Sequence, residues 1–171
     1  MLRRRRPRSS PPSTDNAYDG LRQLALDAVA SGLALPTPDH PDVSGLVVDI
    51  PADGGFATVV ALTDNTTSLY TSVGGGTIGA GGHPAVADLT QQALTVVQAH
   101  LGMFVARSDG SLPPAGSVRF HVLTPSGTRR GDVPEDSFWG RVPHELMPVI
   151  AAVQNLVTGI RETTPSPDQQ G

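Results

Sequence analysis

Three strand-like runs follow one another in the first half of the chain, and only short polar turns separate them. The runs are LVVDI (46–50), FATVVAL (56–62) and SLYTS (68–72). Asp53-Gly54, a typical hairpin turn, joins the first two runs, and Asp64-Asn65-Thr66 joins the second to the third. Because parallel strands need a long crossover connection, turns this short predict an antiparallel meander.

Three further stretches place apolar residues along one side of a helix, and two more alternate as strands do. The helical stretches are 21–29, 84–104 and 149–160, and the strand-like stretches are 118–123 and 128–133. Pro84 stands at the start of the second helical stretch, where its missing N–H costs nothing. The resulting order, α-βββ-α-ββ-α, predicts an α+β fold with a single antiparallel sheet of about five strands packed with three helices.

A length of 171 residues predicts one folded domain, which we place at residues 14–162. An Arg-, Pro- and Ser-rich tail (1–13) precedes it and a polar tail (163–171) follows it. We expect both tails to be disordered, because they have little apolar surface to bury. No window approaches the roughly 18 uninterrupted apolar residues of a membrane-spanning helix, so we expect no membrane span. The basic residues at the start are followed by the polar segment 9–19 and not by the apolar region of a signal peptide, so we expect a cytoplasmic protein.

Positive charge is concentrated at the start of the chain. The tail 1–13 contains five arginines and no acid, while the rest of the chain contains seven arginines against 16 Asp and Glu residues. An acidic body of this kind repels nucleic acid. We therefore expect no nucleic-acid binding beyond weak contacts through Arg3, Arg4, Arg5, Arg6 and Arg8.

Two residue types are missing, and their absence removes several kinds of chemistry. The chain has no cysteine, which excludes disulfides, thiolate zinc sites and cysteine nucleophiles. All 12 basic residues are arginine, which excludes a Schiff-base lysine and the lysine of a P-loop. The histidines show no metal-ligand spacing, and no serine lies in a nucleophile elbow. The sequence therefore favours a protein without metal or cofactor, and it assigns no catalytic residue.

The segment VGGGTIGAGGHP (73–84) is the most unusual local feature. Glycine lets the backbone approach a ligand closely, and the N–H groups at a helix start attract anions. A dinucleotide-binding loop is excluded because no βαβ unit surrounds the segment. Two interpretations remain: a connector that needs glycine for its backbone shape, or a small-ligand or anion site. For the second, the candidate residues are Gly74, Gly75, Gly76, Gly79, Gly81, Gly82 and His83, with Arg119 and Arg129.

The stretches TSLYTSVGGGTIGAGGHPAV (67–86) and VRFHVLTPSG (118–127) resemble a group of small uncharacterised bacterial proteins. These carry TSLY-x-S-x-GGG-x-IG-x-G-x-H-x-AV before a long helix and an RF-x-VLT strand. The resemblance covers most of residues 46–160, but PEDSFWGRVPHELMPVI (134–150) departs from it. It implies a shared fold and a notable glycine segment, and no activity. A looser likeness to profilin-like or roadblock-type domains, which have two strands before the middle helix instead of three, concerns the fold alone.

These observations favour a non-enzymatic protein that acts by self-association or as an accessory subunit. Such a protein is expected to expose an apolar patch on a helix or sheet face. The first alternative is the small-ligand or anion site at the glycine segment. The second is a hydrolase with His83 as general base, which would need a Ser, Thr or Asp within hydrogen-bond reach of the imidazole.

Overall fold

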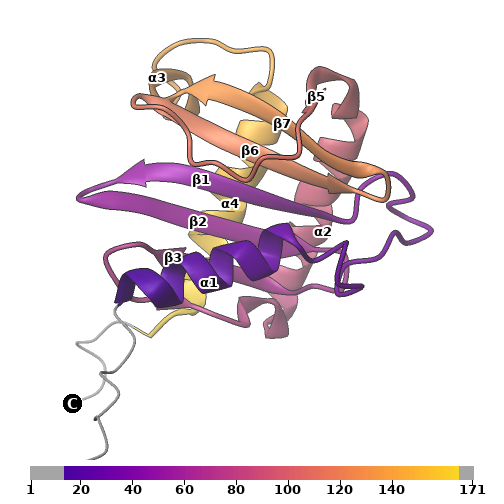
Figure 1. The fold of residues 1–171 in the computed structure, drawn as a ribbon, viewed down its shortest axis with the longest axis horizontal. Helices are drawn as coiled ribbons and strands as arrows, with labels where there is room; N and C mark the ends of the chain where they lie inside the picture. The colour runs from indigo at the N-terminus through magenta and orange to yellow at the C-terminus, as the bar shows by residue number, and fades with distance from the viewer. Residues whose placement is uncertain (1–13, 166–171) are drawn as a thin grey trace, which may run out of the picture.

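An antiparallel sheet of seven strands runs through the middle of the molecule, with helices on both faces (Figure 1). The structure is a computed structural model and describes residues 14–165. The strands are β1 (Gly45–Ala52), β2 (Gly55–Leu62), β3 (Thr67–Thr71), β4 (Gly76–Thr77), β5 (Val105–Ala106), β6 (Ser117–Thr124) and β7 (Gly127–Pro134). Their order across the sheet is β4-β3-β2-β1-β6-β7-β5. The helices are α1 (Thr14–Leu26), α2 (Pro84–Ala99), α3 (Glu135–Phe138) and α4 (Met147–Thr163), with 3-10 turns η1 (Ala80–Gly82) and η2 (Leu101–Met103).

The predicted α+β class and the single antiparallel sheet are confirmed, but two predicted counts were wrong. The sheet has seven strands instead of about five, and residues 14–165 form four α-helices instead of three. β4 and β5 are two residues long and α3 is four residues long, which is too short to leave a periodic pattern in the sequence. The second helix is also shorter than predicted: α2 ends at Ala99, and Phe104 reaches the core from the segment after η2.

Each face of the sheet packs against different helices. α2 and α4 lie together on one face, and α1 lies alone across the other (Figure 1). Neighbouring side chains of β1 alternate between the two cores: Leu46 and Val48 join the core under α2 and α4, whereas Val47 joins the core under α1. β6 is likewise covered on both faces, with every residue from Val118 to Thr124 buried, although its alternation had predicted a half-buried strand.

The glycine run 74–82 forms the turn between β3 and β4 and the 3-10 turn η1 before α2. Gly76 has a φ of 146° and pairs with Tyr70, and a Cβ at this position would collide with the backbone of Leu69. Gly81 packs against Asn65 so closely that a Cβ would overlap the Asn65 carbonyl oxygen. Gly76 therefore requires glycine for its backbone conformation and its close packing, and Gly81 requires glycine for its close packing.

The two expected tails fall mostly beyond the residues that the structure describes. Residues 1–13, with Arg3, Arg4, Arg5, Arg6 and Arg8, and residues 166–171 lie outside the described part, and α4 includes Thr163. Within residues 14–165, no helix combines the length and the apolar character that a bilayer crossing requires.

We predict that Gly81→Ala lowers the free energy of unfolding by at least about 2 kcal/mol, because the new methyl group must displace the backbone at Asn65. Gly82→Ala is the matched control: the neighbouring glycine has nothing within 4 Å of its Cβ position, so its change should stay within about 0.5 kcal/mol. Urea denaturation of both variants measures the difference. Equal stabilities would contradict the close approach at Gly81.

Candidate functional site

The structure does not bring the predicted site residues together. The glycine run and His83 lie at the β3–β4 edge and at the start of α2, whereas Arg119 and Arg129 lie on β6 and β7. Three strands, β3, β2 and β1, separate β4 from β6 in the sheet. Two of the glycine amides already donate to nearby backbone, Gly74 N to Thr71 O (3.2 Å) and Gly82 N to Gly79 O (3.2 Å).

His83 is exposed and occupies the N-cap position of α2 without a capping hydrogen bond from its side chain. Its imidazole makes no hydrogen bond to any residue between 14 and 165. The general-base alternative required a Ser, Thr or Asp partner for this ring. No Ser, Thr or Asp among the described residues is hydrogen-bonded to the His83 ring.

The two candidate arginines hold other parts of the chain. Arg119 donates two parallel hydrogen bonds of 2.8 Å to Asp132, and its Nη1 donates to the hydroxyl and carbonyl oxygens of Ser111 and to the carbonyl oxygen of Leu112. The Asp132 hydrogen bond raises the pKa of Arg119, and the same contact lowers the pKa of Asp132. Arg129 donates to the carbonyl oxygen of Phe104 (2.9 Å). Arg119 is thus the anchor of the loop 107–116.

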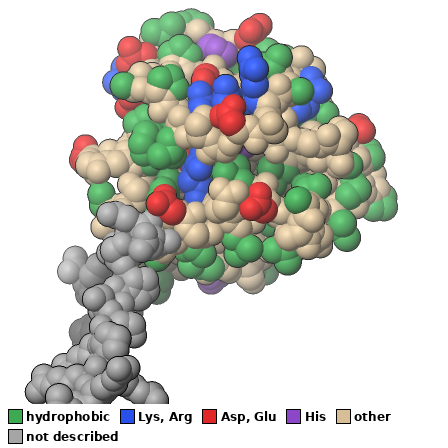
Figure 2. Space-filling view, viewed as in Figure 1, with side chains coloured by type: hydrophobic (Ala, Val, Ile, Leu, Met, Phe, Trp, Pro, Cys, Tyr) green, Lys and Arg blue, Asp and Glu red, His purple; other side chains and the backbone are tan. Residues whose placement is uncertain are grey.

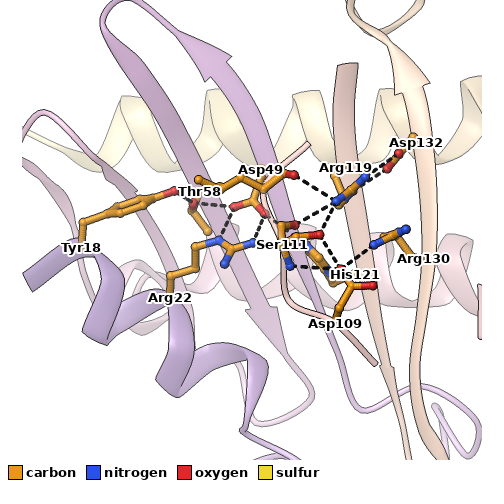
Figure 3. A network of polar contacts seen from close by, with 11 residues as sticks. Tyr18, Arg22, Asp49, Thr58, Asp109, Ser111, Arg119, His121, Arg130 and Asp132 are labelled. Carbon is orange, nitrogen blue, oxygen red and sulfur yellow. Dashed lines mark hydrogen bonds and ion pairs between the residues drawn. The ribbon is translucent and has the colours of Figure 1, made fainter. Parts of the chain in front are cut away.

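A buried polar network centred on Asp49 lies on the α1 face of the sheet (Figure 3). Arg22 donates to both carboxylate oxygens of Asp49, from Nε to Oδ1 at 3.0 Å and from Nη2 to Oδ2 at 2.6 Å. His121 Nε2 lies 3.1 Å from Oδ2. Thr58 donates to Oδ1 (2.8 Å), so Tyr18, 2.7 Å from the Thr58 hydroxyl, must donate to it in turn.

Local geometry explains how these residues meet. Thr58 on β2 lies directly opposite Asp49 on β1, and His121 on β6 lies diagonally across from it. Tyr18 and Arg22 are four residues apart on α1 and therefore share the face that packs on the sheet.

The charge on Asp49 is stabilised despite its burial. Burial alone would raise the pKa of this carboxyl, but hydrogen bonds from His121 and Arg22 and the positive charge of Arg22 outweigh burial and lower the pKa below its ordinary value. An ionised carboxylate can only accept hydrogen bonds, so His121 Nε2 carries a proton and donates it to Asp49. Arg22 Nη2 and His121 Nε2 lie 3.4 Å apart. Because both atoms are then donors, this approach is a contact and not a hydrogen bond.

Two buried polar atoms near this network have no hydrogen-bond partner in the described part of the chain. They are His121 Nδ1 and the hydroxyl group of Tyr70. The Tyr70 ring packs edge-on against Tyr18, with centroids 5.8 Å apart, and burial raises the pKa of its hydroxyl well above the usual range.

The sequence held one signal of this network. Asp49 is the single charged residue in the apolar run 46–50, and a charge in a fully buried strand needs a partner. The partner could not be found from spacing, because Arg22 lies 27 residues before Asp49 and His121 lies 72 residues after it. Among the described residues, no hydroxyl group is hydrogen-bonded to His121, and no three His, Asp or Glu side chains gather as metal ligands.

α1 leaves a hollow on each of its sides. The apolar groove, of about 190 Å³, lies between α1 and the β3–β4 edge, and its main lining residues are Leu21, Leu24, Leu33, Val60, Leu62 and Ile78. A second hollow, of about 370 Å³, lies between α1 and the loop 107–116, and His121 lines it. Gly110 of this loop packs against Leu26 of α1. α1 forms a wall of both hollows. Because Arg22 ties α1 to Asp49, the polar network also determines where these walls lie.

We predict that Asp49→Asn lowers the free energy of unfolding by about 3–5 kcal/mol at neutral pH, because Arg22 is left buried without its counter-charge. Since folding lowers the pKa of Asp49, the stability from its charge is complete above the unfolded value of about 3.9 and is lost as the pH falls through the folded value. The difference between the two proteins should therefore shrink below about pH 4. Urea denaturation across this range measures it.

Asp136→Asn serves as the control for this experiment, because its ion pair with Arg141 is exposed on both sides. Its effect should stay below about 0.5 kcal/mol. An effect as large as that of Asp49→Asn would remove burial as the explanation.

We also predict opposite outcomes for the two buried tyrosines. Tyr18→Phe should cost about 1 kcal/mol, because it deletes the hydrogen bond to Thr58. Tyr70→Phe should be neutral or stabilising, because it removes a buried hydroxyl group without a partner among the described residues. Thermal and urea unfolding of both variants provide the measurement. A clear loss of stability in Tyr70→Phe would show that this hydroxyl group has a partner after all.

Comparison of the chain with protein-family models, with curated proteins and with solved structures finds no match. The resemblance to the group of small bacterial proteins stays a prediction. The function proposed below rests on the geometry of residues 14–165.

Proposed function

We propose that the protein is a non-enzymatic binding protein that associates with a second copy of itself through the apolar groove beside α1. One observation carries the proposal: three large apolar side chains that line this groove are more than half exposed. They are Leu24 at 55%, Leu33 at 52% and Ile78 at 67%. Figure 2 shows this face: most of its charged side chains lie in the upper part, whereas hydrophobic side chains are spread over the face and include several along its lower margin.

Single exposed aliphatic residues are common on protein surfaces, but their grouping is not. Leu24 belongs to α1, whereas Ile78 follows β4, so residues distant in sequence are exposed on the same groove. Burying this surface would contribute roughly 25 cal/mol for each Å² removed from water. Ile78 directly follows β4, and the tight β3–β4 turn brings it to this groove. The glycine run that forms this turn therefore helps to form the surface.

The shape and charge of the surface favour a second copy as its partner. It combines a groove with exposed aliphatic side chains, so two copies related by a two-fold axis can each place these side chains in the groove of the other. Asp64 is the one charged residue among those that line the groove, which matches the depletion of charge in the centre of interfaces.

The salt dependence of association separates a second copy from a basic partner protein. Two acidic copies repel each other over distance, and salt screens that repulsion while leaving apolar contacts intact. Self-association should therefore strengthen as salt is added, whereas binding of a basic partner would weaken.

We predict that the wild-type chain forms a dimer at concentrations of about 10–100 µM, and that Leu24→Asp or Ile78→Asp weakens the dimer by roughly tenfold or more. A charge introduced at either position would have to be buried in the interface without a partner. Light scattering and sedimentation velocity over this concentration range measure the change.

Val105→Asp is the matched control. This valine is 65% exposed, but it lies on β5 at the opposite edge of the sheet. Circular dichroism of the three variants checks that each is folded. The proposal fails if the wild-type chain stays monomeric throughout, or if the control weakens association as much as the groove variants do.

A further inference from the structure

A larger hollow lies on the other face of the sheet, away from the surface proposed for association. It has a volume of about 500 Å³ and lies between the β1–β2 hairpin, α3 and α4. This size falls within the usual range of small-molecule pockets, about 300–1,000 Å³. We call it the α4 pocket.

The floor of the α4 pocket is apolar and belongs to the larger core. Ile50, Leu69, Phe138 and Val157 line it. Trp139 stands beside this floor with 47% of its surface exposed, and its ring packs edge-on against Phe138 at a centroid distance of 5.0 Å. A half-exposed indole next to an apolar floor offers a flat surface on which a ligand can pack.

The charges that line the α4 pocket are one guanidinium and one carboxylate. Arg161, in the last turn of α4, has no acidic group within 4 Å in residues 14–165. Four other arginines of this part, Arg22, Arg119, Arg130 and Arg141, do pair with aspartates. Asp53, in the β1–β2 turn, also lines the pocket, and it forms no ion pair with any residue from 14 to 165. Both side chains are exposed, so both are available to a ligand.

We propose that the α4 pocket binds a small amphipathic monocarboxylate, with its apolar body on the floor and against Trp139 and its carboxylate on Arg161. Guanidinium and carboxylate groups match in charge and in hydrogen-bond geometry. Asp53 restricts the ligand to a single negative charge, because a phosphate or a dicarboxylate would place its additional charge near a second carboxylate.

The experiment titrates the full-length chain with hexanoate, with phenylacetate and with the neutral alcohol hexanol, followed by calorimetry and by NMR. We expect saturable binding of both carboxylates with dissociation constants on the order of 0.1–1 mM, which suits ligands of this size. Hexanol should bind roughly tenfold more weakly than hexanoate, because it leaves Arg161 without a counter-charge. Shifts of the Trp139 indole N–H signal report the place of binding.

Three variants test the roles of the lining residues. Arg161→Gln should weaken hexanoate binding roughly tenfold, while Asp53→Asn should strengthen it severalfold, since the second change removes a repulsive charge. Arg141→Gln is the control for Arg161, because Arg141 is exposed, lies two residues from Trp139 and does not line the pocket. It should leave the affinity unchanged.

The proposal is overturned if neither carboxylate binds saturably, if hexanol binds as well as hexanoate, or if Arg161→Gln has no more effect than Arg141→Gln. Leu24→Asp should bind hexanoate as the wild-type chain does, because Leu24 lies on the other face of the sheet. Loss of self-association and loss of carboxylate binding can therefore be told apart.

Discussion

A carboxylate buried inside a sheet needs a compensating charge, and in this protein that need determines where α1 lies. Asp49 is fully buried on β1, and Arg22 reaches it from α1, which packs across this face of the sheet in front of β2 and β3 (Figure 1). Breaking such a pair is costly, whereas the intact pair adds little net stability, because desolvation offsets much of the attraction. We infer that the pair contributes mainly to the position of α1, and thereby to the two hollows beside that helix.

The two faces of the sheet are built from different kinds of interaction. The face under α2 and α4 is almost entirely apolar, so its packing is non-directional and tolerates a pocket at its margin. The face under α1 combines a smaller apolar core with the polar network of Asp49 and with Arg119, which ties the loop 107–116 to β6. Because directional bonds hold this second face, its surface has a defined shape, which is what an interface between two copies needs.

The strands that the sequence predicted well are the longer ones of the sheet. β1, β2 and β3 appear within one or two residues of their predicted limits, as do β6 and β7, because each has alternating or continuous apolar residues bounded by turns. β4, β5 and α3 were missed because two to four residues carry no period. The predicted site combined residues that the sheet holds apart. Gly76 and Arg129, for example, belong to strands near opposite edges of the sheet.

The sequence by itself determined the α+β class, the antiparallel pairing and the placement of glycine in the turn after β3. These follow from local rules: side-chain periodicity, turn length and the backbone conformations open to glycine. The tertiary structure alone decided that Asp49 meets Arg22 and His121, that three exposed aliphatic residues share one groove, and that Arg161 and Trp139 line one pocket. The reason is physical: periodicity states which side of an element is apolar, while the distance between charges on different elements depends on strand order and on how helices cross the sheet.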